Sequence, residues 1–316
     1  MQVISEEQSA ALVSHELAFA AAREALIAAA GTGAAVYPPV IAHASSSENR
    51  FSVKAGASAE LAGVKIGSYW LRNAQLGLPR HNSLILLFDQ RTGRIAWAIE
   101  AGEVNAYRTA AADAVAADAL ARPDAEVLAI FGAGHQALYE CLALARIRPL
   151  RRLLVVARNA QKAEALVSEL RARGLEARTA AAHEACAEAD MIVSATAATS
   201  PLFDNSWIRP GTHIASMGSD AVGKQELPPD LLDHAALFCD LPSQALAMGE
   251  FQHARGDRAR VTAIGDVLEG RTPGRVSRDQ ITVFDSSGIA LQDLYIARHL
   301  IAVFTGVTEP DRLAEG

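Results

Sequence analysis

Apolar and charged residues alternate at helical spacing over the first thirty positions of the chain. Alanine, leucine and isoleucine recur every three or four residues from 5 to 30, and glycines at 31 and 33 end the pattern. This spacing predicts one amphipathic helix over residues 5–30. From 37 to 100, short β-type runs are separated by Gly, Asn and Pro, which predicts antiparallel strands joined by turns. The expected strands are Arg50–Ala55, Ala62–Trp70, Ser83–Asp89 and Ile95–Glu100.

An alanine-rich helix is expected next, over residues 105–121, because alanine has the highest helix propensity. After Pro123, short apolar runs alternate with helical segments, which predicts βαβ units and a parallel sheet. A last helix at about 289–303 is expected to leave this sheet. The expected strands of the second half are Glu126–Phe131, Arg152–Ala157, Asp190–Ala195, His213–Met217, Ala236–Asp240 and Ile281–Asp285.

Composition narrows the class of protein. A chain of 316 residues is long enough for about two domains, and its net charge of −7 argues against a nucleic-acid partner, which needs a basic surface. Three scattered cysteines indicate free thiols in a reducing compartment. The acidic N-terminal segment does not resemble a signal peptide, and no run of 18 apolar residues predicts a membrane helix. We therefore expect a cytoplasmic protein without a membrane partner. The nine histidines show no metal-ligand spacing, so we expect no metal.

A glycine-rich turn carries the first chemical signal. Gly132, Gly134 and Ala137 form a GxGxxA motif directly after the strand Glu126–Phe131 and at the start of a helix. In this context the first glycine permits the tight turn, the second lets the backbone approach a pyrophosphate, and the helix N-terminus attracts the phosphates. The motif predicts dinucleotide binding, and the alternative is a tight turn that binds nothing.

The end of the second strand of this half bears on the choice of cofactor. Arg158 stands where a carboxylate would hydrogen-bond the adenosine ribose, and a guanidinium pairs well with a 2′-phosphate. We therefore predict that NADP(H) is preferred, with NAD(H) as the alternative. The competing interpretation is that Arg158 is a solvated surface arginine.

Two basic residues stand in unexpected places in the first half. Lys65 lies in an otherwise apolar strand, where burial is costly unless the ammonium is paired. Arg108 begins the alanine-rich helix, where a cation opposes the helix dipole, although an anionic ligand would explain it. Both residues are candidates for a substrate site. The alternatives are a strand-edge lysine facing water and a surface arginine.

Several segments, taken together and in order, resemble the ornithine cyclodeaminase/mu-crystallin family. The resemblance covers about residues 45–295, and three of its motifs together are far more specific than the glycine turn alone. The segments are Val64–Gly67, Gly77–Pro79 with Asp89–Gly93, Tyr107–Ala111, Phe131–Ala137, Met217–Leu227 and Ser287–Asp293.

The resemblance implies an α/β fold with a Rossmann dinucleotide-binding domain and an α+β substrate-binding and dimerisation domain. The Rossmann domain would span residues 122–289. The other domain would be discontinuous, with residues 1–121 and 290–316, and would form a homodimer.

The resemblance also implies roles for individual residues. Lys65 and Asp220 match the family's catalytic residues. Arg50, Lys65 and Arg108 match the groups that bind the substrate carboxylate, and His81 lies near them. The residues expected to bind the cofactor are Thr109, Gly132, Gly134, His135, Gln136, Arg158, Asn159, Thr196, Met217, Ser287 and Gly288.

The resemblance implies a nicotinamide enzyme acting on small amino or imino acids. The leading prediction is reduction of Δ1-pyrroline-2-carboxylate to L-proline, with the six-membered Δ1-piperideine-2-carboxylate as a homologous substrate that gives L-pipecolate. The alternatives are an ornithine cyclodeaminase with bound NAD, an alanine dehydrogenase, and an NADPH-binding crystallin-like protein without turnover. Arg158 favours the reductase over the cyclodeaminase, because the cyclodeaminases carry an acidic residue there. Asp220 argues against a purely binding role, because the crystallin branch lacks this carboxylate.

Overall fold

The computed structural model describes residues 1–257 and 260–307, and the chain divides into two compact units. The first unit is formed by Met1–Arg108 and the chain from Ile289 onward, and the second is Thr109–Gly288. The division falls inside helix α3 (Val104–Leu120), whereas the sequence suggested a boundary at its C-terminal end. The substrate-binding and dinucleotide-binding roles of the two parts stay predictions at this point.

The first unit is built on a seven-stranded sheet, whose main path runs β1-β7-β6-β5-β4-β2. The four predicted antiparallel strands are confirmed as neighbours in this order along the sheet. Shorter strands, of two to four residues, were not predicted because such lengths show no periodicity. The strands are β1 (Gln2–Ile4), β2 (Ala35–Val36), β3 (Val40–His43), β4 (Asn49–Ala57), β5 (Ala62–Trp70), β6 (His81–Phe88) and β7 (Ile95–Glu100); a 3-10 helix (Leu71–Leu76) follows β5.

The N-terminal helix is broken, so the prediction of one helix is wrong. Helix α1 (Glu6–Leu12) ends at an extended Val13, and α2 (His15–Ala30) begins after it. The reason is local, because the Oγ of Ser14 accepts a hydrogen bond from the Leu17 N–H at 3.1 Å and caps a new helix. The apolar spacing continues across the break, which hides it in the sequence.

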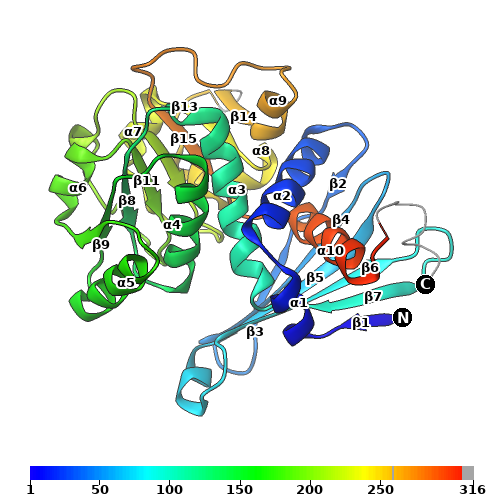
Figure 1. The fold of residues 1–316 in the computed structure, drawn as a ribbon. Helices are drawn as coiled ribbons and strands as arrows, with labels where there is room; N and C mark the ends of the chain where they lie inside the picture. The colour runs from blue at the N-terminus through cyan, green and yellow to red at the C-terminus, as the bar shows by residue number, and fades with distance from the viewer. Residues whose placement is uncertain (258–259, 308–316) are drawn as a thin grey trace. The chain divides into compact units, whose positions relative to one another are not determined.

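Helix α10 (Ala290–Thr305) packs against α2 and against one face of the sheet formed by β4, β5 and β6 (Figure 1). Glycines make this approach close. A Cβ added to Gly63 would stand 2.9 Å from Leu294 Cδ2, and one added to Gly56 would stand 3.1 Å from the Cβ of Ala290. The sheet face that carries Gly63 and Lys65 is therefore covered by α10.

The second unit contains an eight-stranded, wholly parallel sheet with the order β10-β9-β8-β11-β12-β15-β13-β14 (Figure 1). From the central strand β8, the chain continues first to β9 and β10 on one side. It then returns to the other side of β8 as β11, so the direction in which strands are added reverses between β8 and β11. Such a reversal is where doubly wound sheets bind ligands. The strands are β8 (Val127–Phe131), β9 (Arg152–Val156), β10 (Ala177–Thr179), β11 (Met191–Ser194), β12 (His213–Ser216), β13 (Ala236–Cys239), β14 (Val261–Ala263) and β15 (Thr282–Asp285).

Helices connect these strands, as the alternating pattern predicted. The short strands β10 and β14 were missed, since each has only three residues. The helices are α4 (His135–Ile147), α5 (Ala160–Ala172), α6 (Ala182–Glu188), α7 (Pro229–His234), α8 (Pro242–Met248) and α9 (Ile264–Leu268), with short 3-10 helices at Asn205–Trp207 and Glu250–His253.

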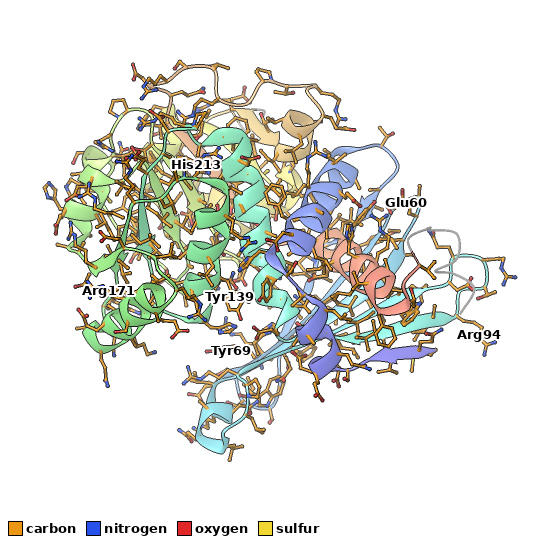
Figure 2. The ribbon with its side chains drawn as sticks, in the orientation of Figure 1. Glu60, Tyr69, Arg94, Tyr139, Arg171 and His213 are labelled. Carbon is orange, nitrogen blue, oxygen red and sulfur yellow. The ribbon has the colours of Figure 1, made fainter. Side chains whose placement is uncertain are left out.

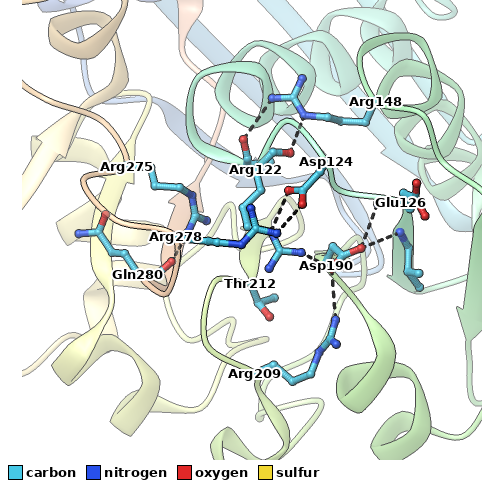
Figure 3. Close-up of polar contacts among 12 residues, drawn as sticks. Arg122, Asp124, Glu126, Arg148, Asp190, Arg209, Thr212, Arg275, Arg278 and Gln280 are labelled. Carbon is cyan, nitrogen blue, oxygen red and sulfur yellow. Dashed lines mark hydrogen bonds and ion pairs between the residues drawn. The ribbon is translucent and has the colours of Figure 1, made fainter.

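Asp190 ties together the edge of this sheet at which β8 and β11 begin (Figure 3). One carboxylate oxygen accepts hydrogen bonds from the Glu126 and Val127 N–H groups, at 2.9 and 3.1 Å. The other accepts from Arg122 at 2.6 Å and Arg209 at 3.2 Å. These bonds fix the edge opposite the glycine turn, and the network is structural.

His213 lies inside the sheet on β12 (Figure 2). Burial is the main cause that lowers its pKa to about 3, and its Nδ1 lies 2.9 Å from the Thr282 Oγ1. It is a neutral core residue. Among the described residues, no helix is long and apolar enough to cross a membrane.

Candidate active site

Three ionisable side chains from distant parts of the sequence meet in the interior of the first unit. Lys65 lies on β5, Arg108 on α3 and Asp293 in the first turns of α10, and each residue is less than 10% exposed. The Asp293 Oδ1 lies 3.2 Å from the Lys65 Nζ and 3.1 Å from the Arg108 Nε. A single carboxylate thus faces two cations.

Amide side chains complete this cluster. Asn105 Oδ1 accepts hydrogen bonds from the Lys65 Nζ and, at 2.7 Å, from the Arg108 Nη2. Gln292 Oε1 accepts from the Arg108 Nη1 at 3.3 Å. The second oxygen of Asp293, Oδ2, is buried and has no hydrogen-bond partner. The two cations are therefore held in place, with acceptor capacity still open beside them.

The electrostatics make Lys65 unusually easy to deprotonate. Burial, the nearby Arg108 and Lys54 lower the pKa of Lys65 to about 7, although Asp293 opposes the shift. Burial alone would raise the pKa of Asp293, but Lys65 and Arg108 outweigh it and hold that pKa below its usual value. A substrate carboxylate bound here would stabilise both cations, which have lost their contact with water, and would raise the pKa of Lys65.

Polar side chains pack closely around Gly67, on the sheet face that carries Lys65. A Cβ added to Gly67 would stand 3.3 Å from the Ser52 Oγ, 3.7 Å from the Lys65 Cε and 3.9 Å from the His81 Nε2. Ser83 is the partner of Gly67 on β6, and its buried Oγ has no hydrogen-bond partner. The structure thus brings Lys65, Arg108 and His81 to one region of the sheet.

Arg50, predicted to bind the same carboxylate, is exposed and lies further along the sheet. It pairs in register with Tyr69, which in turn pairs with His81. Tyr69 stands four residues beyond Lys65, which is about 13 Å along a strand. Arg50 therefore lies on the same face of the sheet as Lys65 but outside the buried cluster.

The glycine turn in the second unit has the geometry that its motif predicted. Gly132 has φ +119°, and a Cβ there would stand 2.6 Å from the Ala195 carbonyl oxygen, so only glycine fits. Gly134 is the N-cap of α4, and no atom lies within 4 Å of where its Cβ would be. The helix N-terminus is therefore open to an anion on the side that Gly134 faces.

The side chains that follow the turn are engaged within α4. The ring of His135 packs against the ring of Tyr139 at a tilt of 53°, with centroids 4.8 Å apart, and the Gln136 Nε2 donates to the Glu140 Oε1 at 2.8 Å. Glu140 in turn faces Asp113 of α3, and burial raises the pKa of Asp113 to about 7. Predicted contacts of His135 and Gln136 with a cofactor stay predictions.

Arg158 is exposed just after β9, the strand that pairs with β8, and so lies beyond the same edge of the sheet as the glycine turn. Its neighbour Asn159 caps α5, because the Asn159 Oδ1 accepts a hydrogen bond from the Lys162 N–H at 2.9 Å. This cap accounts for Asn159 without a ligand. Arg158 has no such structural task among the described contacts.

Glu226, which the sequence did not single out, holds the ends of two strands. Its Oε1 accepts from the Thr196 N–H and Oγ1, each at 2.7 Å. Its Oε2 accepts from the Ser194 Oγ at 2.9 Å, the Ser216 Oγ at 3.0 Å and the Gly218 N–H at 2.9 Å. Thr196 and the buried Met217, both predicted to border the cofactor, are thus positioned by one carboxylate.

Ser287 and Gly288 are buried or fixed by hydrogen bonds at the end of the second unit. The Gln244 Nε2 donates to the Ser287 Oγ at 2.8 Å and to the Gly288 carbonyl at 2.9 Å. The Asp240 Oδ2 accepts from the Gly288 N–H at 2.8 Å. Close by, burial together with Asp240 and Glu250 raises the pKa of Asp285 well above its usual value.

Asp220, the predicted catalytic acid, is exposed in the loop after β12 and forms an ion pair with Lys224. Thr109 is half-buried on α3. The structure places both in the second unit, where their predicted roles are not tested. No group of three or more histidine, cysteine or carboxylate residues in the described part of the chain is arranged to hold a metal.

A model of the ornithine cyclodeaminase/mu-crystallin family matches residues 3–303 of the chain. The iminosuccinate reductase of Paracoccus denitrificans is 37% identical over 310 residues, which cover 95% of this chain and 96% of that protein.

Solved structures are similar over almost the whole chain. The P. denitrificans iminosuccinate reductase in complex with NAD+ has a TM-score of 0.89 and 34% identity, with 98% of each chain covered. The Thermococcus litoralis Δ1-pyrroline-2-carboxylate reductase in complex with NADH and L-proline has a TM-score of 0.89 and 27% identity, and covers 98% of this chain and 100% of that one. These likenesses and the parallel sheet confirm the predicted α/β fold class.

Proposed function

The chain belongs to the ornithine cyclodeaminase/mu-crystallin family, as its motifs predicted, and on that premise we propose that it is a nicotinamide-dependent oxidoreductase that reduces the C=N bond of an α-imino acid. The buried cluster of Lys65, Arg108 and Asp293 carries the proposal. Two cations against one carboxylate leave a net positive charge that suits an amino-acid carboxylate. The open N-terminus of α4 supports the binding of a dinucleotide.

Lys65 and Arg108 bind the substrate carboxylate in this proposal and orient the imine, while Asp293 and Asn105 keep both cations in position. A reduced nicotinamide, when bound, supplies the hydride that adds to the imine carbon. The imine nitrogen takes a proton at the same time, and Asp220 or Lys65 through a water is the proposed donor. The product is an amino acid.

The cofactor proposed for this chain is NADP(H). Arg158 is exposed after β9, and the strand end carries no carboxylate that would repel a 2′-phosphate. The related structures named above contain NAD+ and NADH, so NAD(H) is the competing cofactor. Arg158→Asp is expected to raise the KM for NADPH about tenfold or more and to leave the KM for NADH nearly constant. Arg151→Asp, at the other end of β9, is the matched control.

The assay for the proposed function is oxidation of NADPH or NADH by the purified chain with imine substrates. The mixtures compare Δ1-pyrroline-2-carboxylate, Δ1-piperideine-2-carboxylate, and pyruvate or oxaloacetate with ammonia. Ornithine is incubated in parallel, because ammonia release without net cofactor oxidation would identify a cyclodeaminase. Tight NADPH binding without turnover on any imine would instead support a crystallin-like protein and refute the proposal.

A homodimer is proposed from the outer face of the first sheet. Ile66 faces away from α10 on β5 and is 40% exposed, and its register partners Val53 and Leu84 are also apolar. An apolar row on an uncovered sheet face is typical of a subunit interface. A second copy of the chain is the proposed cover.

A further inference from the structure

Four carboxyl groups are buried beyond the carboxyl ends of the strands in the second unit, and the proposed reaction uses none of them. Each of the four residues is fully buried. Water cannot stabilise a charge there, so a carboxyl group stays ionised only where hydrogen-bond donors surround it. The residues are Glu226 in the loop after β12, Asp240 after β13, Asp285 at the end of β15 and Glu250 at the start of the 3-10 helix that follows α8.

Glu226 is surrounded by donors. Its two oxygens accept five hydrogen bonds of 2.7 to 3.0 Å, and an ionised carboxylate, which only accepts, suits such a site. One carboxylate therefore ties together the segments that leave β11 and β12. The donors are the N–H and Oγ1 of Thr196, the N–H of Gly218, and the hydroxyl groups of Ser194 and Ser216.

The segment that Glu226 holds lies against the glycine turn. A Cβ added to Gly132 would stand 2.6 Å from the Ala195 carbonyl oxygen and 3.4 Å from the Thr196 Cγ2. On its other side the segment is confined by Gly218, where an added Cβ would overlap the Thr196 carbonyl oxygen and stand 2.6 Å from the Glu226 Oε1. A shift of Glu226 would thus move residues in contact with the turn that is proposed to bind the dinucleotide phosphates.

A single hydroxyl group lies between Glu226 and a second carboxyl group. The Ser216 Oγ is 3.0 Å from the Glu226 Oε2 and 3.2 Å from the Glu250 Oε2. A serine hydroxyl carries one proton and donates to one acceptor, so the other carboxyl group must supply a proton of its own. Apart from Ser216, the described residues offer Glu250 only the N–H groups of Glu226 and Leu227. Glu250 is therefore the group that holds the proton, and it donates to the Ser216 Oγ.

The electrostatics of Glu250 agree with this assignment. Burial is the main cause that raises the pKa of Glu250 to about 7, and the charge of Glu226 adds to the shift. The N–H groups of Leu227 and Glu226 oppose it without cancelling it. The proton on Glu250 is therefore lost within the physiological pH range.

The other charged groups near Glu250 do not supply a counterion. Asp285 faces it from β15, and burial together with Asp240 raises the pKa of Asp285 well above its usual value. Helix α8 packs against the same 3-10 helix and has no ionisable side chain. The Lys224 ammonium forms its ion pair with Asp220.

We propose that Glu226 is a positioning residue for the dinucleotide and that it acts in this way only while Glu250 carries a proton. The inference rests on the proposed function, because it concerns how the cofactor of that function is held. Glu250 donates to Ser216, Ser216 donates to Glu226, and the last carboxylate holds Thr196 against the glycine turn. Loss of the proton leaves two carboxylates beside one hydroxyl group, and their repulsion displaces the Thr196 segment.

Fluorescence titration of the full-length protein with NADH tests the proposal without any imine. NADH is the probe because it lacks the 2′-phosphate of NADPH, which itself titrates near about pH 6. The Kd of the wild type for NADH should rise about tenfold from pH 6 to pH 8, because the protonated form binds. A constant Kd would overturn the role of the proton. A protein that binds neither NADH nor NADPH would overturn the proposed function as well.

Glu250→Gln imitates the protonated carboxyl group. Its Oε1 can accept from the N–H groups of Glu226 and Leu227 while its Nε2 donates to the Ser216 Oγ, so this variant is expected to fold. Its Kd for NADH should stay at the low-pH value of the wild type from pH 6 to pH 8. Glu176→Gln, at an exposed site before β10, is the matched control and should keep the wild-type pH dependence. A wild-type rise of the Kd in Glu250→Gln would refute the role of Glu250, which a purely structural side chain would not reveal.

Glu226→Gln replaces one acceptor oxygen by an NH2 group that faces other donors. We expect the Kd for NADH to rise about tenfold or more at pH 6 and to lose its pH dependence. Thermal unfolding at pH 6 identifies a variant that does not fold, and the comparison of Glu250→Gln with the wild type then decides alone. A wild-type Kd in folded Glu226→Gln would overturn the positioning role and leave the proposed function standing.

Discussion

At the scale of single residues, the main feature is a lysine whose charge depends on its neighbours. Lys65 is buried beside one carboxylate and two cations, and its pKa is lowered to about 7. Its protonation therefore changes within the physiological range, whereas an exposed lysine would stay charged. In the proposed function, this one group links substrate binding to pH.

This linkage predicts a pH dependence. If Lys65 binds the substrate carboxylate in its ammonium form, as proposed, kcat/KM should fall as pH rises through about 7, by about tenfold per unit. Lys54→Met should move that decline to higher pH, since the Lys54 charge lowers the pKa of Lys65. The comparison is made on one substrate, so that titration of the imine itself affects both proteins equally. Identical pH profiles of kcat/KM for the wild type and Lys54→Met would exclude an effect of the Lys54 charge on Lys65.

Asp113 gives a second prediction, on stability. Burial raises its pKa to about 7, so the folded chain keeps a proton that the unfolded chain loses near pH 4. Its contribution to the free energy of unfolding therefore decreases as pH rises from about 4 to 7, by on the order of 2 kcal/mol between pH 5 and 8.

Asp113→Asn should remove this part of the pH dependence, because an amide side chain does not titrate. Urea unfolding at pH 5 and pH 8 measures the difference. Asp233→Asn, at an exposed site on α7, is the control and should keep the wild-type slope. A wild-type slope in Asp113→Asn would show that the carboxyl group is ionised in the folded chain.

At the scale of elements, the two glycines of the turn between β8 and α4 have different causes. Gly132 is required by the fold, because φ +119° and the Ala195 carbonyl leave no room for a Cβ. Gly134 has an ordinary φ of −92° and free space around it, so the fold does not require glycine there. A ligand pyrophosphate is the proposed reason for the second glycine.

Alanine substitutions test this separation. Gly132→Ala should lower the unfolding midpoint and weaken dinucleotide binding together. Gly134→Ala should keep the free energy of unfolding within about 1 kcal/mol of the wild type but weaken NADPH binding about tenfold or more, because its methyl group would occupy the proposed phosphate position. Thermal unfolding and fluorescence titration provide the two measurements. Wild-type affinity in Gly134→Ala would argue against phosphate binding at this turn.

The sequence predicted these elements better than it predicted the contacts between them. Strands such as Ala62–Trp70 follow from local alternation, and the predicted bounds match the observed ones. The break at Ser14 was hidden because the apolar spacing continues across it. Asp293 and Glu226 lie inside motifs that were recognised, yet their roles depend on partners far away in the sequence. Only the folded chain brings Asp293 to Lys65, or Glu226 to Thr196.

At the scale of the whole molecule, the uncovered face of the first sheet predicts self-association. Ile66→Lys should place a charge in the proposed interface and shift the mass measured by light scattering from twice 33.4 kDa toward 33.4 kDa. Val222→Lys, at an 80% exposed site in the second unit, should leave the mass unchanged. A monomeric wild-type protein would refute the proposed dimer.

The ion cluster also has a consequence for the order in which the protein matures during synthesis. Lys65 and Arg108 emerge early from the ribosome, but their counterion Asp293 follows only after the entire parallel-sheet unit has been made. Closing so long a loop is slow, because non-local contacts must first overcome the entropy of the intervening chain. A nascent chain therefore carries these two cations without their carboxylate until the start of the last helix, α10, has been made. The complete ion cluster therefore cannot form before Asp293 has been synthesised.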